Sequence, residues 1–537
     1  MRRKIISLFL IFTLLLQPVA AIPFPLAKKL GLSYYKKINF EIKALSEGVD
    51  PETLGVVVNE TLGLPEFIIQ YQPGFKDEVV KLVEENGGKV IKSYDDLCML
   101  KIAIEPEKVF KECWFGLKVE GLVTSPYILS IEANAYIKNV PPIIQFSDPT
   151  QLNEPESTMY DIKREMGILQ LYPNVTGKNV TIAILDTGAN INLTYNGVRV
   201  FYDRFNQNIS RVIAVKNFIT GQEDYINITY DANGTIVSIH NVNASIVADG
   251  NDVQHGTWCA FALAGWTGDL NTSGIAPDAK LVIGKVLDDS GAGTIADVIE
   301  GIKWAADLDL DKDGNPDVDI ISMSLGSTYY IKSAAAAVKY AVDKGIIVFI
   351  AAGNSGFSTE PWINSPADTP YPGIIAVAAL TNHGADSERA FFSSYGPDPD
   401  KETRDECPDI GAPGLKIVGL VKDTNYASTN DDFYPAMNLT LSGTSMATPI
   451  AAGCAALILD ARPEFKKRPV ELERLIFDTA TRLPNVGVTE CKYGLINPAA
   501  AIEGKYNHVS QEHVRTKSAR YADLRHSAMS FYESLWR

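Results

Sequence analysis

Between about residue 166 and residue 380, short apolar runs alternate with stretches of helical periodicity. Continuous apolar runs of strand length indicate strands that are buried on both faces, as in a parallel sheet. Five such runs occur, at residues 180–185, 281–287, 318–325, 346–351 and 374–379, with helical patterns at 295–306 and 334–344 between them. The pattern predicts a doubly wound α/β domain with a mostly parallel sheet. Folds of this kind carry their chemistry at the carboxyl ends of the strands.

A smaller unit precedes that domain. Its pattern predicts strands at 67–71, 89–94, 98–104 and 128–137, and helices at 76–85 and around 106–113. The order β-α-β-β-α-β is that of the ferredoxin-like split motif, so we expect a small α+β domain at about residues 64–140. A polar linker at 141–165 follows, punctuated by Pro141, Pro142, Pro149 and Pro155.

The two ends of the chain have their own character. Arg2, Arg3 and Lys4 precede an apolar run at residues 5–16, and small residues at 19–21 supply a cleavage site. This is typical of a secretory signal peptide at 1–21, the alternative being a retained membrane anchor. No other stretch is expected to approach membrane-spanning length, so we expect an extracellular protein without a stable anchor. A basic tail with three histidines occupies residues 504–537, and we expect it either to dock on the acidic body or to be trimmed.

Composition narrows the range of partners. The chain has 537 residues, a net charge of −16 and a pI near 5.0. Such an acidic protein is a poor match for nucleic acid, because phosphate backbones require a cationic surface. The charge balance fits a soluble protein, and it fits the binding of metal cations.

Six cysteines are too few for a disulfide scaffold in a chain of 537 residues. Cys259 and Cys454 lie in apolar helical contexts and are expected to be core residues. The sequence leaves open whether Cys407 pairs with Cys491 and Cys98 with Cys113.

Glycosylation acceptors of the form Asn-x-Ser/Thr cluster in one polar stretch. The five acceptors of this cluster are Asn192, Asn208, Asn227, Asn233 and Asn243. In an exported protein such a cluster predicts a solvent-exposed insertion that carries glycans.

One uncharged stretch, residues 441–459, opens with small polar residues and continues without a charge. A helix that is apolar on every side belongs in a protein core. Its glycine-bearing start suits a turn that presents a hydroxyl at a helix N-terminus, where negative charge is stabilised. Ser445 is therefore a candidate nucleophile. The alternative is that Ser442, Thr444 and Ser445 only cap the helix.

Three more polar residues occur where a parallel sheet places its chemistry. Asp186 ends one apolar run, Asn354 follows another, and His255 opens a second uncharged helical stretch. Each has a structural alternative: a turn cap for Asp186, a left-handed turn for Asn354 and a satisfied core histidine for His255. Together with Ser445 they supply an acid, a base, a nucleophile and an amide donor.

The segments A-I-L-D-T-G, H-G-T-W-C-A, A-A-G-N-S-G, F-S-S-Y-G-P, A-P-G and L-S-G-T-S-M-A-T-P resemble the subtilisin-like serine proteases over about residues 166–503. The resemblance implies a Ser445 nucleophile, a His255 base and an Asp186 that orients the imidazole. It also implies that Asn354, with the Ser445 N–H, stabilises the oxyanion.

The resemblance also implies a zymogen. Residues 22–140 would be the family's inhibitory, fold-assisting propeptide, cut by the enzyme itself between about Val140 and Met159. Two substrate-binding strands would pair with an extended peptide. Their residues would be Ser290, Gly291, Ala292 and Gly293 on one side, and Ser324, Leu325 and Gly326 on the other.

The chain departs from the family pattern in two places. Trp258 stands where the family commonly has histidine, three residues after His255, and we expect the indole to alter the packing behind His255. Asp186 and His255 lie 69 positions apart, and the long stretch between them contains the cluster of glycosylation acceptors. We expect this stretch to narrow access to the cleft.

An acidic stretch after the second predicted strand has the ligand spacing of a calcium loop. Oxygen-bearing residues alternate around Gly314 at the sixth place, although the twelfth place holds Ile320 in place of glutamate. The expected ligands are Asp309, Asp311, Asp313, Asn315 and Asp317. The alternative is a solvated acidic loop. Similar proteases carry a structural calcium in this region.

The sequence therefore predicts a secreted, self-processing serine endopeptidase of broad specificity that needs no organic cofactor. Its partners would be protein and peptide substrates and its own propeptide, and we expect a monomer. The alternatives are a processing protease with restricted substrates and a catalytically silent binding protein with the same fold.

Overall fold

The computed structural model describes residues 40–113, 118–140, 151, 153–231, 233–397, 407–425 and 433–506. The predicted signal peptide, linker residues 141–150 and the tail beyond residue 506, including its histidines, lie outside these ranges.

An eight-stranded sheet forms the centre of the larger domain, in the order β13-β12-β16-β9-β18-β20-β21-β22. All neighbours are parallel except β13, which runs antiparallel to β12 at the edge. The strands are β9 Thr181–Asp186, β12 Val212–Asn217, β13 Glu223–Tyr225, β16 Lys280–Lys285, β18 Ile320–Met323, β20 Ile347–Ala351, β21 Ile374–Leu380 and β22 Ile410–Pro413. Five of them are the apolar runs predicted above. The predicted run at 318–325 divides into β18 and the short β19 Leu325–Gly326.

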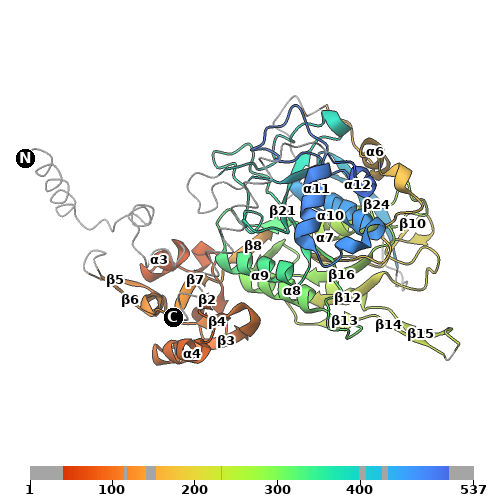
Figure 1. Ribbon diagram of the computed structural model, residues 1–537. Helices are drawn as coiled ribbons and strands as arrows, with labels where there is room; N and C mark the ends of the chain where they lie inside the picture. Colours follow the sequence, from red (N-terminus) through yellow and green to blue (C-terminus); the bar gives the residue numbers. More distant parts are fainter. Residues whose placement is uncertain are drawn as a thin grey trace, which may run out of the picture.

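Helices cover both faces of this sheet (Figure 1). On one face lie α7 His255–Ala264 and α10 Thr444–Ala461, with α11 Pro469–Thr479 and α12 Pro498–Glu503 outside them. On the other face α8 Ile295–Asp307 packs against α9 Lys332–Asp343. The prediction of a doubly wound α/β domain agrees with this three-layered architecture.

The helix α10 occupies the centre of the core. Its residues Thr444 to Leu459 are all buried, which satisfies a helix that is apolar on every side. Within the described residues, α10 is the one helix that is both long enough and apolar enough to cross a membrane. In the folded protein 89% of it is buried. The expectation that no second stretch reaches that length was therefore wrong, since residues 444–461 do so as a core helix.

The N-terminal unit contains the antiparallel sheet β1-β2-β4-β3, with β7 on the other side of β2. The elements are β1 Val58–Asn59, β2 Leu64–Tyr71, α4 Lys76–Glu85, β3 Lys89–Tyr94, β4 Met99–Ala103, α5 Pro106–Val109 and β7 Ile128–Ala133, preceded by α3 Phe40–Ser46. The helix at 76–85 and the strand at 89–94 have the predicted bounds.

Two predicted elements of this unit are divided in the structure. The expected helix at 106–113 is only the single turn α5, after which β5 Lys111–Cys113 and β6 Lys118–Glu120 form a hairpin. The expected strand at 128–137 ends at Ala133, and the chain continues as a separate strand, β8 Tyr136–Asn139. This strand leaves the N-terminal sheet and enters the larger domain.

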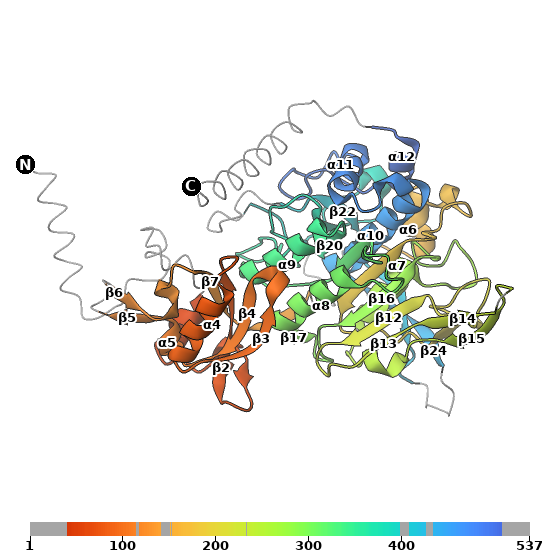
Figure 2. The ribbon, with the colours of Figure 1, turned by 60° about the horizontal axis from the view of Figure 1, so that its bottom comes forward.

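One face of the N-terminal sheet packs directly on α8 and α9, as the view in Figure 2 shows. Ile68, Tyr94 and Met99 are buried in the same apolar cluster as the residues of those helices. Polar contacts surround this interface. The Tyr94 hydroxyl donates to Glu300 at 2.8 Å, and Lys303 pairs with Asp96.

Two side chains of the N-terminal unit also cap these helices. The Glu132 carboxylate accepts hydrogen bonds from the N–H groups of Lys332 (2.7 Å) and Ser333 (2.9 Å), at the start of α9. The Asn134 side chain accepts from the N–H of Ala296, in the first turn of α8. The first N–H groups of a helix have no partner within the helix. These contacts therefore join the two units at the N-terminus of α8 and at the N-terminus of α9.

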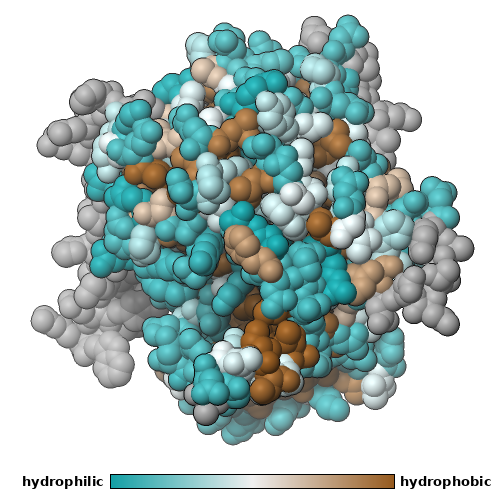
Figure 3. Space-filling model, turned by 90° about the vertical axis from the view of Figure 1, so that its right-hand side faces the viewer, coloured by the Kyte–Doolittle hydropathy of each residue, from teal (hydrophilic) through white to brown (hydrophobic). Residues whose placement is uncertain are grey.

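The glycosylation acceptors lie on the outer edge. Asn208, Asn227, Asn233 and Asn243 are exposed and Asn192 is half-buried. β14 Asn227–Tyr230 and β15 Ile236–His240 form a hairpin that points away from the N-terminal unit in Figures 1 and 2. Figure 3 views this side of the molecule, which is mainly hydrophilic with one apolar cluster near its lower edge.

The thiols of Cys98 and Cys491 are free, so neither of the disulfides left open by the sequence forms. The Cys491 thiol is buried and contacts the carbonyl oxygen of Gly494 at 3.4 Å. Cys259 and Cys454 are buried in the core, as predicted.

The caps predict how the N-terminal unit can be loosened. In the full chain, Glu132→Gln replaces one acceptor oxygen by an amide that cannot accept from both N–H groups. We expect a loss of about 1 kcal/mol in docking and faster hydrogen exchange at the first-turn amides of α9. Glu84→Gln, at an exposed position of α4, is the control and should leave exchange unchanged. Equal exchange in both variants would contradict the capping role.

Candidate active site

The four residues singled out by the sequence meet at one edge of the large sheet. Asp186 is the last residue of β9, and His255 is the first residue of α7. Asn354 follows β20, and Ser445 is the second residue of α10. Parallel strands bring their carboxyl ends to one edge, which explains how residues so distant in sequence come together.

A short hydrogen bond joins the acid to the base. His255 Nδ1 lies 2.7 Å from Asp186 Oδ1, and both side chains are almost completely buried. The Thr187 N–H donates to the same carboxylate oxygen at 2.7 Å. His255 Nε2 makes no hydrogen bond within the described residues, so this nitrogen remains available to exchange a proton.

Glycine makes this contact possible. A Cβ atom on Gly256 would lie 2.1 Å from the Gly188 carbonyl oxygen and 3.1 Å from Asp186 Cβ. Those distances are too short for any side chain, so α7 can begin this close to β9 only with glycine at position 256. Gln254, with φ 48° and ψ 55°, turns the chain into the helix.

The surroundings raise the pKa of His255. Burial by itself would lower the pKa, because it disfavours the charged imidazolium. The negative charge and hydrogen bond of Asp186, together with the charge of Asp249, outweigh burial. The imidazole is therefore a stronger base than a solvent-exposed histidine.

Asp249 is a residue that the sequence did not single out. Its carboxylate accepts from the Thr187 hydroxyl (3.0 Å) and from the N–H (2.9 Å) and hydroxyl (2.7 Å) of Thr257. It thereby ties the loop after β9 to the first turn of α7. Burial raises its pKa to about 6, although these hydrogen bonds oppose the shift. In the sequence it stands in a polar stretch without periodicity, which gave no signal of burial.

The Ser445 hydroxyl donates to the carbonyl oxygen of Val140 at 2.7 Å. The carbonyl oxygen of Ser445 has no helical partner, because Pro449 four residues later lacks an N–H. It accepts instead from the Ser324 hydroxyl at 3.0 Å and from the Cys259 thiol at 3.4 Å. Two neighbouring segments, the one at Ser324 and helix α7, thus fix the backbone that carries the hydroxyl.

Asn354 is oriented through its side-chain oxygen. That oxygen accepts from the N–H of Thr444 at 2.9 Å and from its hydroxyl at 3.0 Å. With the oxygen fixed on α10, the amide nitrogen lies on the side of Gly443 and Ser445, where a Cβ on Gly443 would meet it at 3.1 Å. The geometry gives Asn354 a hydrogen-bond donor beside the serine.

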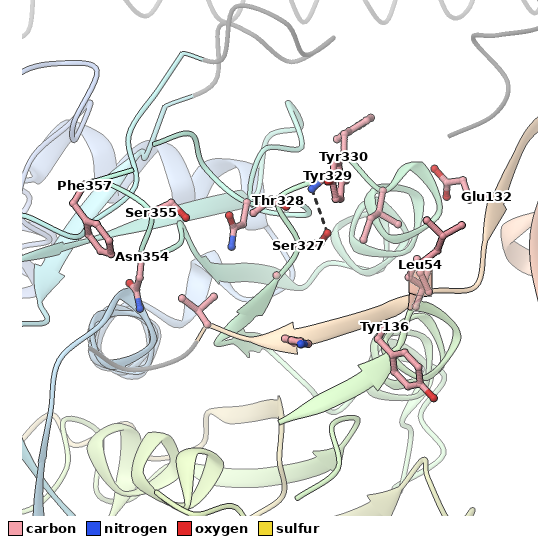
Figure 4. Close-up of a pocket in the computed structure, with 17 residues that line it drawn as sticks. Leu54, Glu132, Tyr136, Ser327, Thr328, Tyr329, Tyr330, Asn354, Ser355 and Phe357 are labelled. Carbon is pink, nitrogen blue, oxygen red and sulfur yellow. Dashed lines mark hydrogen bonds between the residues drawn. The ribbon is translucent and has the colours of Figure 1, made fainter. Parts of the chain in front are cut away.

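The strand β8 of the N-terminal unit lies between β17 Ala292–Thr294 and β19 Leu325–Gly326, antiparallel to both. Lys138 is opposite both Ala292 and Gly326, and the Val140 N–H donates to the Ser324 carbonyl at 3.0 Å. Figure 4 shows this strand beside a pocket that Asn354, Ser355 and Phe357 line at one end and Tyr136 at the other.

Most of the predicted substrate-binding residues take part in this three-stranded arrangement. Ala292, Gly293, Leu325 and Gly326 are in the ladder. Ser290 and Gly291 do not pair and instead form the turn before β17, where Gly291 has φ 80° and the Ser290 hydroxyl donates to Asp288.

Trp258 is fully buried, and its Nε1–H donates to the Leu439 carbonyl at 2.9 Å. A Cβ on Gly419 would come within 2.3 Å of this nitrogen. The indole therefore fits only over glycine, and it ties α7 to the hairpin of β23 Ile417–Lys422 and β24 Tyr434–Leu441. Within the described ranges, no residue of the β14–β15 hairpin lines the pocket beside β8, so the hairpin does not narrow it.

The acidic loop lies between α8 and β18. The carboxylates of Asp309, Asp311 and Asp313 offer oxygens within 4.8 Å of one another. Asp309 accepts from the N–H groups of Asp313 and Gly314, so the loop wraps around this residue. Burial and the charges of Asp311 and Asp309 raise the pKa of Asp317.

The family model described as the subtilase family matches residues 177–495, more than half of the chain. The chain belongs to the subtilase family. The serine protease AprX of Bacillus subtilis is 32% identical over 345 residues, which cover 62% of this chain and 68% of AprX. An alkaline protease of Alkalihalobacillus alcalophilus is 27% identical over 445 residues, covering 82% of this chain and 89% of that protein. This subtilase is accordingly a serine endopeptidase.

A solved structure gives the fold a counterpart. Fervidolysin from Fervidobacterium pennivorans, described as a keratinolytic enzyme related to subtilisin, superimposes with a TM-score of 0.57 at 22% identity. The match covers 82% of this subtilase but 61% of the fervidolysin chain, which is less than two thirds. At this identity the likeness shows the fold alone.

The raised pKa of His255 predicts the acid side of the pH profile. A base acts only while it is unprotonated, and a raised pKa keeps His255 protonated up to a higher pH. We expect kcat/KM on a peptide substrate to fall as the pH drops through a midpoint above 6.5. Asp186→Asn should lower that midpoint and reduce the rate by about 10⁴-fold, the loss known for this change in another serine protease.

The exposed His383 provides the control for this measurement. His383→Asn should leave the profile as in the wild type. A midpoint at or below 6.5 in the wild type would show that Asp186 does not raise the pKa of the base.

Proposed function

We propose that this subtilase is a secreted endopeptidase made as a self-processing zymogen, with Asp186, His255 and Ser445 as its triad. The observation that supports this most directly is the hydrogen bond from Ser445 Oγ to the carbonyl oxygen of Val140. The strand that ends at Val140 is paired on both edges, as an extended substrate would be. The N-terminal unit thus presents one of its own peptide bonds to the nucleophile.

The reaction follows from the positions of these groups. His255 Nε2 takes the hydroxyl proton as Ser445 Oγ attacks the carbonyl carbon, and Asp186 stabilises the resulting imidazolium. The Asn354 amide and the Ser445 N–H donate to the oxyanion. His255 then returns the proton to the leaving nitrogen, which departs and leaves an acyl-enzyme on Ser445. A water molecule then attacks the acyl-enzyme, with His255 taking its proton. His255 returns the proton to Ser445 Oγ, and the new carboxylate is released.

The N-terminal unit acts in this proposal as an inhibitory propeptide of the ferredoxin-like type. Its strand order, with β2 between β4 and β7 and β3 outside β4, supports the assignment. Its strand fills the substrate site, and its caps on α8 and α9 favour the folded arrangement of both helices. The same contacts would assist folding and block substrates.

The bond presented to Ser445 leads from Val140 into Pro141. Proline has no N–H, because a ring carbon takes the place of that hydrogen on the nitrogen. The residue before proline is also held in an extended conformation. We therefore infer that self-cleavage follows Val140 and that it is slow.

A comparison of the wild type with Ser445→Ala tests the proposal. The wild type should separate into two chains whose new terminus follows Val140, and it should then label with a fluorophosphonate. Ser445→Ala should remain one chain and stay unlabelled. Mass spectrometry of the fragments locates the cut.

Pro141→Ala is the matched variant for the rate. It restores an N–H at the leaving nitrogen, so the separation should be faster than in the wild type. An equal rate would mean that the ring does not limit cleavage, and a cut elsewhere in both proteins would refute Val140 as the site. Absence of both cleavage and labelling would contradict the zymogen mechanism.

We also propose that the loop 309–317 holds a structural calcium ion. Three carboxylates whose oxygens lie within 4.8 Å of one another repel unless a cation neutralises them, and hard oxygen ligands suit calcium. Asp309, Asp311 and Asp313 would bind it, with Asn315 and Asp317 completing the predicted set. The ion would stabilise the connection from α8 to β18 and take no part in catalysis.

Chelation tests this site in the full chain with Ser445→Ala, which prevents self-digestion. A calcium chelator should lower Tm, and added calcium should restore it, because a ligand bound only to the folded state stabilises that state. Asp311→Asn should lower Tm and abolish the response to chelator. Glu78→Gln, an exposed carboxylate of α4, should change neither. A Tm that chelator leaves unchanged would refute the calcium site.

Specificity, export and assembly complete the proposal. Pairing through the backbone of β17 and β19 favours broad specificity, and a processing protease with few substrates is the alternative. The signal-like N-terminus and the exposed acceptors Asn208, Asn227, Asn233 and Asn243 support an extracellular glycoprotein. We propose a monomer that needs no organic cofactor and acts on proteins and peptides.

A further inference from the structure

The residue before His255 has a backbone conformation that side chains seldom adopt. Gln254 has φ 48° and ψ 55°, in the left-handed region that favours glycine. Its carbonyl oxygen accepts from the Trp258 N–H at 2.9 Å and so begins α7. A residue stays in this region when its surroundings hold it there. The position at which His255 leaves the chain therefore depends on the contacts that hold Gln254.

The Gln254 side chain supplies such contacts. It is 5% exposed, and its carboxamide pairs with the backbone of Lys422, the last residue of β23. Its Oε1 accepts from the Lys422 N–H at 2.8 Å, and its Nε2 donates to the Lys422 carbonyl oxygen at 2.8 Å. A carboxamide that pairs in both directions with one residue imitates a hydrogen-bonded pair of an antiparallel ladder. The start of α7 is thereby attached to the β23–β24 hairpin.

A second carboxamide continues this connection to the loop that follows Asp186. Asn190 Nδ2 donates to Gln254 Oε1 at 2.8 Å and to the Asp249 carbonyl oxygen at 2.9 Å. Its Oδ1 accepts from the Asp249 N–H at 3.3 Å, so Asn190 also pairs with one residue in both directions. The two carboxamides thus form one chain of hydrogen bonds, which runs from the loop after β9 through the start of α7 to the hairpin.

The hairpin contacts α7 a second time, one turn further along. The Trp258 indole donates to the Leu439 carbonyl oxygen in β24 and lies against Gly419 in β23. Positions four apart lie on one face of a helix, so Gln254 and Trp258 attach that face to the hairpin. The Trp258 contact acts on the body of the helix, whereas the Gln254 contact acts where His255 begins it.

We propose, on the basis of the function proposed above, that Gln254 and Asn190 are positioning residues for the base. Within the described ranges, neither residue lines the pocket beside β8, so their carboxamides do not bind a substrate that pairs there. They act through the backbone of α7 and of the loop after β9. They hold those segments together, so that the 2.7 Å contact between His255 and Asp186 persists while the imidazole gains and loses a proton.

The test compares Gln254→Met with the wild type in the full chain. Methionine has nearly the length of glutamine but lacks the amide, so both pairings with Lys422 are lost with little change in volume. We expect slower self-cleavage and a kcat on a peptide lower by about tenfold to a hundredfold, the order of loss for a catalytic group displaced by about 1 Å. KM should stay as in the wild type, because β17 and β19 are untouched. Rates are counted per serine that labels with a fluorophosphonate at completion.

Two measurements separate positioning from a loss of stability. A proton in a hydrogen bond as short as that between His255 Nδ1 and Asp186 resonates far downfield in an NMR spectrum. In Gln254→Met this resonance should broaden through faster exchange with water. In a double-mutant cycle with Asn190→Ala, the two losses in kcat should combine to less than their product, because either change interrupts the same chain of hydrogen bonds.

Asn497→Ala is the control for general destabilisation. The Asn497 side chain accepts from the Ala500 N–H at 2.9 Å and caps α12, which lies outside α10. Its loss should lower Tm while kcat and the downfield resonance stay as in the wild type. If Gln254→Met does not fold, Gln254→Gly takes its place, because glycine adopts the left-handed backbone without strain and removes only the side chain.

The outcomes distinguish this proposal from the one on which it rests. If the wild type neither cleaves itself nor hydrolyses peptides, the proposed protease function fails, and the NMR comparison still tests whether Gln254 holds His255 on Asp186. If the wild type is active and the Gln254 variant keeps its kcat and its resonance, the carboxamides do not position the base. Losses from Gln254→Met and Asn190→Ala that simply multiply would also refute the proposal.

Discussion

The structure around the active-site edge depends on the buried hydrogen bond between His255 and Asp186. A carboxylate and an imidazole at almost zero exposure lose their hydration, and that loss must be offset by nearby polar groups. The Thr187 N–H supplies one such group, and Asp249, bound to Thr187 and Thr257, holds the two segments in register. Glycine at position 256 allows those segments to approach closely enough. The hydrogen bond and negative charge of Asp186, with the charge of Asp249, raise the pKa of His255 against the effect of burial.

The position of Ser445 is also fixed by neighbouring polar groups, which here act on its backbone carbonyl. Ser445 lies at the start of a buried helix, and Pro449 leaves its carbonyl without the usual helical partner. Ser324 and Cys259 take over that oxygen. Ser324 belongs to the segment that also binds the strand ending at Val140. The position of the hydroxyl and the position of the peptide are thus fixed by one shared segment.

Much of this arrangement could be predicted from the sequence, for identifiable reasons. Strands buried on both faces, such as β9 and β20, read as unbroken apolar runs, and the polar residue that follows each run then marks the active-site edge. The edge strands β13 and β22 are short and gave no clear run. Asp249 was missed because its burial is created by residues distant in sequence. The prediction of a helix at 106–113 was wrong. The helix α5 ends after a single turn, and the chain continues into the β5–β6 hairpin.

The N-terminal strand showed the limits of local pattern most clearly. Residues 128–137 read as one strand, and only the tertiary structure reveals that the chain changes partners at Asn134 and Ala135. Whether Cys98 pairs with Cys113, and Cys407 with Cys491, likewise depends on distances in the folded chain. The spacing of the cysteines along the sequence does not determine those distances.

The three-stranded arrangement of β17, β8 and β19 has a consequence for the enzyme if the middle strand leaves, as the proposed processing requires. Two strand edges then face one another across an open slot, each with a row of N–H and C=O groups in search of partners. Any extended segment would fit there, including a frayed segment of a neighbouring enzyme molecule. A net charge of −16 on the full chain makes such neighbours repel one another. The net negative charge therefore opposes association between enzyme molecules through the unpaired strand edges of the substrate site.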